Sequence, residues 1–219
     1  MIVCGYPGAV HDASELVRSY LFLRRGVGLL GTALPFVLIA GNLLIEKELL
    51  YSVSGYYHSS MRDVYVGTMC AIGVFLLFYR GYARSDRAAS IVAGVAAIGV
   101  AIFPIPDGTP ITSTASGVLH LVFAVVLFGT FAYFCLVEFR KSDAPQPTAR
   151  KRRRNQVYLV TGVIIVGCLV LVPIVELIGG LDHLRPVLWL EAVATVAFGV
   201  AWLTKGEAIL GDHAPGSVR

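Results

Sequence analysis

The sequence predicts an all-α, polytopic membrane protein with six transmembrane helices and both termini in the cytoplasm. Of the 219 residues, 56% are hydrophobic and only 15% are charged, whereas a soluble domain averages about 45 to 50% apolar residues. The apolar residues form separate stretches, each near the ~20 residues that a helix needs to cross a hydrocarbon core of ~30 Å. The Lys and Arg residues lie almost entirely in alternate connections between these stretches.

The distribution of apolar residues divides the chain into three parts. Residues 1–25 are too polar to span a bilayer, and their apolar side chains lie among Arg18, Arg24 and Arg25, so we expect an amphipathic segment on the cytoplasmic headgroups. The bundle occupies residues 26–204, and residues 205–219 form a cytoplasmic tail. The six predicted spans are residues 26–45, 63–78, 88–103, 116–137, 157–177 and 186–204.

Capping and helix-breaking residues mark several ends of these spans. Ser113 or Ser116 is placed to cap the fourth span. Pro173 predicts a kink in the fifth span, and the glycines at 179–180 predict its end. Pro186 stands at the first turn of the sixth, where proline is tolerated because the amide there has no partner within the helix.

The Lys and Arg residues predict the orientation. With a cytoplasmic N-terminus, fifteen of the eighteen fall on the cytoplasmic side, and the other three are Lys47, Arg62 and Arg185. Such an excess is typical of cytoplasmic segments. The basic run at residues 150–154 directly precedes a span, which favours a topology signal that also contacts anionic lipid over nucleic-acid binding. We therefore expect membrane lipid, and no nucleic acid, as a partner.

This threading brings polar and ionisable residues from distant parts of the chain to one level near the outer surface. Residues 52–63, between the first two spans, hold His58, Arg62 and Asp63. Other connections and span ends add Asn42, Asp107, His120, Glu176, Asp182, His183, Arg185 and Glu191. An ionised side chain facing lipid is costly, so we expect these groups to face the bundle interior and to form a polar pocket that opens outward.

The chemistry of this level suggests a metal. Imidazoles and carboxylates suit Zn²⁺, and we expect His58, His120 and either Asp63 or Glu191 to bind it. In the structural interpretation, a His and a carboxylate only hydrogen-bond each other and fix helix packing, and no HxxxH or HExxH motif places two ligands on one helix face.

Several further residues at the level of residues 52–63 are also candidates. Arg62 is expected to pair with Asp63 or Glu191, or else to bind an anionic headgroup. Asn42 and Glu176 lie at the same level and are candidate ligand-binding residues. The tyrosines at positions 51, 56, 57 and 65 are typical of an interfacial aromatic belt, and the alternative is a substrate platform.

Two resemblances accompany these residues. The stretch from Ser52 to Tyr82 resembles a group of uncharacterised bacterial integral membrane proteins, which implies a bacterial cytoplasmic membrane and carries no function. Ser54-x3-His58 and the segment that begins at Asp63 are similar to elements of the CREST superfamily, which includes alkaline ceramidases and the progestin and adiponectin receptors. That resemblance implies zinc and hydrolysis of a lipid amide, although CREST proteins have seven helices and a pair of histidines that this chain lacks.

Three functions follow as hypotheses. The first is a membrane protein whose outward pocket binds a lipid, a small ligand or a metal ion, or senses pH through its histidines. The second is a zinc-dependent lipid amide or ester hydrolase, in which Asp63 or Glu191 completes the site or acts as general base and Ser54 or Tyr57 stabilises the oxyanion. The third is a transporter or an oligomeric channel, and the chain is a candidate homo-oligomer. The incomplete set of metal ligands favours the first.

Overall fold

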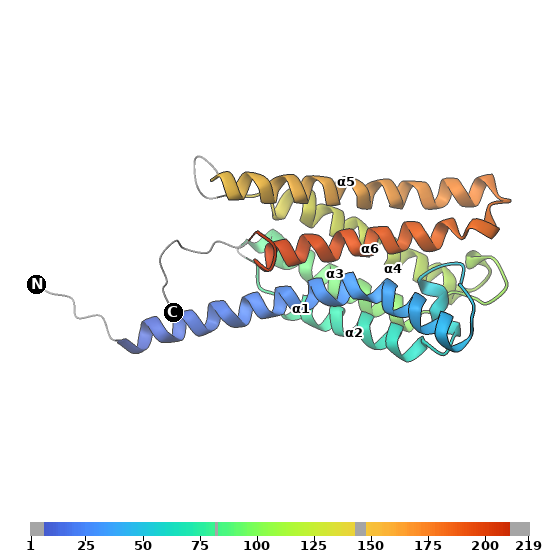
Figure 1. Ribbon diagram of the computed structural model, residues 1–219, viewed down its shortest axis with the longest axis horizontal. Coiled ribbons are helices and arrows are strands. Elements are labelled where there is room, and N and C mark those ends of the chain that lie inside the picture. Colours follow the sequence, from blue (N-terminus) through green and yellow to red (C-terminus); the bar gives the residue numbers. More distant parts are fainter. Residues whose placement is uncertain (1–6, 82, 143–147, 211–219) are drawn as a thin grey trace, which may run out of the picture.

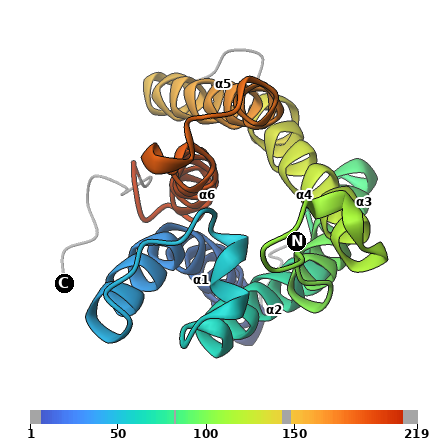
Figure 2. The same ribbon diagram turned by 90° about the vertical axis from the view of Figure 1, so that its right-hand side faces the viewer.

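The computed structural model describes residues 7–81, 83–142 and 148–210, with side chains from residue 21 onward. Its six α-helices are α1 (Pro7–Ile45), α2 (Arg62–Phe78), α3 (Arg84–Ile102), α4 (Ala115–Tyr133), α5 (Ala149–Ile178) and α6 (Pro186–Lys205). The helices run side by side along one axis (Figure 1). Seen down that axis, they follow one another around a ring in chain order, and α6 closes the ring against α1 (Figure 2). The prediction of an all-α bundle is confirmed.

The dimensions and the surface are those of a membrane protein. Within the described ranges, five helical segments are long and apolar enough to cross a membrane, namely residues 21–45, 84–102, 115–138, 149–178 and 186–205. Large apolar side chains are exposed on the outside of the ring, with Leu44, Phe78 and Leu177 more than 70% accessible. Lipid tails can cover such a surface, whereas water would leave it unfavourably exposed. The sixth helix, α2, has 17 residues and is about 25 Å long.

Several helix ends match the prediction and others differ. Pro186 occupies the first turn of α6, and α5 ends at Gly179, whose φ of +64° favours glycine, as expected. The cap of α4 is Thr114, whose hydroxyl accepts a hydrogen bond from the amide of Gly117. The prediction of Ser113 or Ser116 was therefore wrong, and the Ser116 hydroxyl instead donates to the carbonyl of Pro104.

The N-terminal helix is longer than predicted. α1 continues without a break through residue 26, where the sequence suggested a boundary between an interfacial segment and the first span. The basic run likewise forms the first turns of α5 instead of a linker before it. The predicted ends of the chain fall partly outside the described residues, which leave out 1–6 and 211–219.

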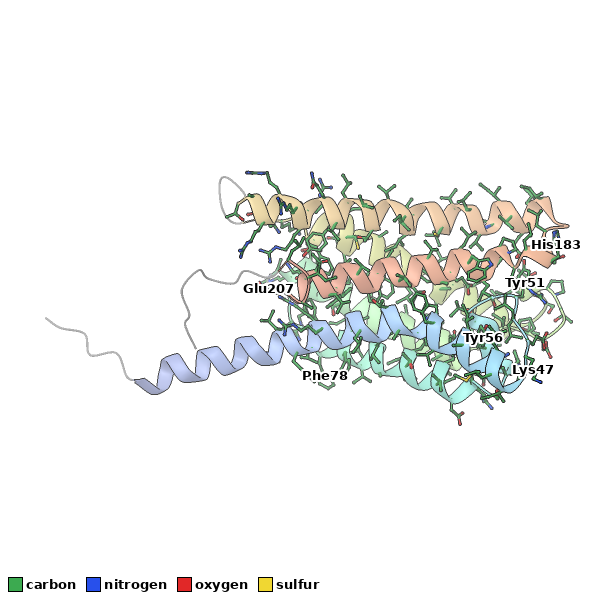
Figure 3. All side chains as sticks on the ribbon, in the orientation of Figure 1. Lys47, Tyr51, Tyr56, Phe78, His183 and Glu207 are labelled. Atoms are coloured by element: carbon green, nitrogen blue, oxygen red, sulfur yellow. The ribbon has the colours of Figure 1, made fainter. Side chains whose placement is uncertain are left out.

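The two ends of the bundle are built differently. At the end where residues 49–60 fold across the ring, a short 3₁₀ helix, η1 (Ser54–His58), lies between α1 and α2; we call this the η1 end. At the opposite end, Trp202 is completely buried among the aromatic rings of Tyr79, Phe134, Phe139 and Phe198; we call this the Trp202 end. Figure 3 shows Tyr51, Tyr56 and His183 at the η1 end and Phe78 and Glu207 at the other.

A single π turn, η3 (Phe134–Glu138), continues α4 at the Trp202 end. It buries Phe134, Cys135 and Glu138. The Glu138 carboxylate accepts hydrogen bonds from the hydroxyl of Tyr133, at 2.6 Å, and from the ammonium of Lys141, at 2.7 Å. The turn thus ends α4 with a buried carboxylate that has two donors.

Candidate functional site

Residues 49–60 form the covering segment of the η1 end, and hydrogen bonds within and just before this segment hold it in place. The buried side chain of Asn42 donates to the carbonyl of Glu48 at 3.0 Å, which turns the chain back over the ring after α1. The hydroxyl of Ser52 accepts a hydrogen bond from the amide of Gly55 at 2.9 Å and so starts η1. Asn42, a predicted ligand-binding residue, is engaged in holding this loop.

His120 reaches η1 from the first turns of α4 and is only 3% exposed. Its Nδ1 lies 2.7 Å from the carbonyl oxygen of Phe103, and its Nε2 lies 3.0 Å from the hydroxyl oxygen of Ser54. Because a carbonyl only accepts hydrogen bonds, Nδ1 carries the proton, and in the neutral ring Nε2 accepts from the Ser54 hydroxyl. The imidazole is therefore held in one tautomer with its basic nitrogen on Ser54.

Glu191 reaches the same point from α6. Its Oε2 accepts hydrogen bonds from two consecutive backbone amides, that of Val53 at 2.7 Å and that of Ser54 at 3.3 Å. These amides open η1 and are oriented by its turn. The structure thus brings together three of the predicted site residues, Ser54, His120 and Glu191, although they are far apart in the sequence.

A small cavity lies in the ring beneath Ser54. Its volume is about 40 Å³. Its lining is apolar except at Ser54, Tyr65, Glu191 and Thr195. The apolar part is lined by Leu34, Val53, Met69, Ile72, Val100, Ala124, Leu127, Phe128, Phe131 and Phe198. The cavity therefore has a polar end under η1 and an apolar remainder within the bundle.

Tyr65 is the unexpected member of this site. Its side chain is 2% exposed, and its hydroxyl has no hydrogen-bond partner among the described residues. Tyr56 is also buried, so the interpretation of these two tyrosines as an interfacial belt was wrong. The sequence showed a tyrosine near the start of a predicted helix. It did not show that this side chain faces the interior of the ring.

The other predicted site residues lie outside this cavity. His58 is exposed, with its Nε2 at 2.7 Å from the carbonyl of Ile105. Arg62 donates to the hydroxyl of Tyr57 at 2.7 Å and lies over its ring, whereas we expected it to pair with Asp63 or Glu191 or to bind an anionic headgroup. Asp63 is exposed at the start of α2.

Two further carboxylates hold the η1 end together. Glu176 accepts a hydrogen bond from the hydroxyl of Tyr51, which links α5 to the covering segment. Partial burial and this carboxylate together raise the pKa of Tyr51 well above its usual value. Glu46 accepts from the amide of Ser60 at 2.7 Å, and this hydrogen bond lowers the pKa of its carboxyl.

The predicted zinc ligands are not assembled. In the part of the chain that the structure describes, no group of three or more His, Cys, Asp or Glu side chains is placed to hold one metal ion. His120 has both ring nitrogens engaged, with Phe103 and Ser54, and His58 is bound to Ile105 outside the cavity. His120 and Glu191 both contact η1: the imidazole contacts the hydroxyl of Ser54, and the carboxylate accepts from the amides of Val53 and Ser54.

No protein-family model, no curated protein and no solved structure matches this chain. The site geometry itself is therefore the basis for any functional conclusion.

Proposed function

We propose that this protein is a six-span protein of a bacterial cytoplasmic membrane, with both termini in the cytosol and the η1 end at the outer face. The positive-inside distribution supports this orientation, because the η1 end carries only Lys47, Arg62 and Arg185 whereas the Trp202 end carries the basic run of α5. The position of α2 within the ring, between α1 and α3, supports counting it as a sixth span (Figure 2).

We further propose that the cavity beneath η1 binds the polar end of a small amphiphile or lipid. The observation that carries this proposal is the buried hydroxyl of Tyr65, which lies beside Ser54 and Glu191 and makes no hydrogen bond of normal geometry with the described residues. Leaving such a group unsatisfied costs about 1 to 3 kcal/mol, and a carbonyl or hydroxyl of a ligand would accept or donate the missing hydrogen bond. The apolar part of the cavity suits a short hydrocarbon chain next to that polar group.

The size of the cavity limits what enters it. A volume of about 40 Å³ accommodates roughly three water molecules, so a group of about three non-hydrogen atoms fits without movement of the lining. A short acyl or alkyl group meets this limit, and a longer chain would have to extend out of the cavity toward lipid or the outer face.

Binding of acetamide, whose acetyl group has the size of the cavity, to the protein in lipid nanodiscs tests the proposal. Ala124 lines the cavity and Val125, on the same helix, is 47% exposed on the outside. We expect saturation-transfer NMR to detect acetamide on the wild type and on Val125→Leu, and to lose it on Ala124→Leu, which fills the cavity. Tyr65→Phe should weaken binding by about three- to tenfold, as expected for one hydrogen bond. Equal binding to Ala124→Leu and wild type, or none to either, would contradict the proposal.

A further inference from the structure

Ser54 and His120 have the arrangement of an activated serine. Their 3.0 Å contact is within the range of about 2.6 to 3.2 Å that joins a nucleophile to its general base. A third group, the carbonyl of Phe103, fixes the imidazole at 2.7 Å on its other side. In serine hydrolases a carboxylate commonly has this orienting role; here a backbone carbonyl holds the same tautomer.

The backbone beside Ser54 already binds a carboxyl oxygen. The amides of Val53 and Ser54 converge on Oε2 of Glu191, at 2.7 and 3.3 Å. Two convergent amides, one of them belonging to the nucleophile itself, are the donors that stabilise the oxyanion in acyl transfer. The oxygen of Glu191 thus marks a place where two backbone amides donate to one oxygen next to the Ser54 hydroxyl.

The cavity supplies the remaining element, a space for the acyl group. It begins at Ser54 and continues among apolar side chains such as Met69 and Phe131. The volume of about 40 Å³ fits an acyl group of roughly two to three carbons. The hydroxyl of Tyr65 lies at the polar end of this space, where it can donate to a substrate oxygen.

We propose that Ser54 is a catalytic nucleophile that accepts a short acyl group from an ester, with His120 as its general base. The inference rests on the proposed function, because the substrate occupies the same cavity. It adds a covalent reaction that requires no metal ligand.

The reaction passes through an acyl-serine. Ser54 Oγ attacks the ester carbonyl carbon while its proton passes to Nε2 of His120, and the carbonyl oxygen becomes an oxyanion that replaces Glu191 Oε2 on the amides of Val53 and Ser54. The bond from carbon to the alcohol oxygen then breaks, and the alcohol leaves with the proton from Nε2. Water next attacks the acyl-serine, gives a proton to Nε2 and releases the carboxylic acid as the proton returns to Ser54.

A fluorophosphonate probe, which phosphonylates activated serines, tests this assignment on the full chain in nanodiscs. We expect one adduct, mapped by mass spectrometry to Ser54 and lost in Ser54→Ala. In His120→Gln the labelling rate should fall by about 10²- to 10⁴-fold, the usual contribution of a general base. Ser116→Ala is the matched control and should label like the wild type, because Ser116 lies at the same end and contacts only a backbone carbonyl among the described residues.

A second variant keeps the test decisive where His120→Gln does not fold. In Ser54→Cys, the rate of alkylation by iodoacetamide should rise with pH around a thiol pKa well below the usual value of about 8.5, because the imidazole stabilises the thiolate. An adduct on another serine, a labelling rate unchanged in folded His120→Gln, or alkylation with the ordinary thiol pH profile would overturn the inference. If acetamide still binds in that case, only the nucleophile is lost; if the wild type binds no acetamide, the proposed function fails first.

Discussion

The two ends of the bundle use aromatic and polar residues in opposite ways. At the Trp202 end, Trp202 packs edge-on against Tyr79 and Phe139, with ring centroids 5.0 and 5.4 Å apart. The hydroxyl of Tyr79 lies 3.4 Å from both Arg24 and Asp86, so it joins α1 to α3. At the η1 end, the buried hydroxyl of Tyr65 has no partner in the described structure and faces a cavity.

This difference separates packing from binding within one small bundle. The rings at the Trp202 end fill space, and aromatic pairs of this geometry add about 0.5 to 1.5 kcal/mol each beyond the area that they bury. The η1 end instead leaves space open beside buried polar groups, which lowers stability and prepares a site. We therefore expect substitutions at the Trp202 end to change stability and those at the η1 end to change binding.

Trp202→Ala should have the largest effect on stability. Removing a fully buried indole leaves a large cavity and costs about 3 to 5 kcal/mol. The control is Trp189→Ala, since Trp189 lies on the same helix and is 49% exposed. Unfolding in mixed detergent micelles, followed by circular dichroism, should show a clear loss of stability for Trp202→Ala and little change for Trp189→Ala. Equal losses would mean that the Trp202 end is not the main stabilising cluster.

Replacement of Tyr79 by phenylalanine should lower stability, whereas the same replacement of Tyr65 should not. Tyr79→Phe removes a hydroxyl that contacts Arg24 and Asp86 and should cost about 1.5 kcal/mol. Tyr65→Phe removes a buried hydroxyl that lacks a partner and should leave stability unchanged or raise it by up to about 1 kcal/mol. The same unfolding measurement compares the two variants, and a loss at Tyr65 as large as that at Tyr79 would show that its hydroxyl is already satisfied.

The contact between α1 and α6 gives a third comparison. A Cβ on Gly199 of α6 would lie 2.5 Å from the backbone nitrogen of Thr32 and 2.7 Å from the carbonyl oxygen of Gly28. Gly199→Ala therefore has to push α6 away from α1, at a cost of about 1 to 3 kcal/mol. Gly167→Ala on α5 is the control, because a Cβ there meets nothing within 4 Å, and it should be neutral or stabilising by about 0.5 kcal/mol. An equal effect of both would exclude close contact of α1 and α6 at this position.

The smallest expected effect is a pH dependence confined to the η1 end. The amide of Ser60 lowers the pKa of Glu46 below its ordinary value of 4.5. On acidification, the Glu46 carboxylate therefore takes up a proton in the unfolded chain before it does so in the folded chain. The contribution of Glu46 to folding stability is full above pH 4.5 and is lost as the pH falls through the lower pKa of the folded state. Melting curves at pH 6 and pH 3 should converge for Glu46→Gln and wild type only at the lower pH. Glu48→Gln serves as the control, and a constant difference at both pH values would contradict the assignment.

The membrane bundle could be predicted because its signals are local. Apolar length sets the spans, and the placement of Lys and Arg sets which connections share a side. The same rules predicted that Ser54, His120 and Glu191 lie at one depth, and the structure brings these three together. Depth along a helix follows from counting residues at 1.5 Å each.

The direction of each side chain around its helix could not be predicted in the same way. Packing sets this rotation, as in the close approach of Gly28 to Gly199, which no single stretch of sequence encodes. His58 illustrates the limit, since the 3₁₀ turn places Ser54 at the cavity and leaves His58 exposed at Ile105. His58 therefore does not meet His120 in the described structure, and Tyr65 was missed for the same reason.

The π turn η3 fixes the phase between the two ends of α4. Such a turn holds one residue more than the α turn that it replaces, so the residues before and after it are offset by about 100° relative to a regular helix. Deleting one residue within 134–138 would remove that offset and rotate His120 about the helix axis relative to Glu138. One of the two would then have to leave its partner, Ser54 in the first case or Lys141 in the second. A single extra residue at the Trp202 end thus determines the rotational position of an imidazole at the η1 end.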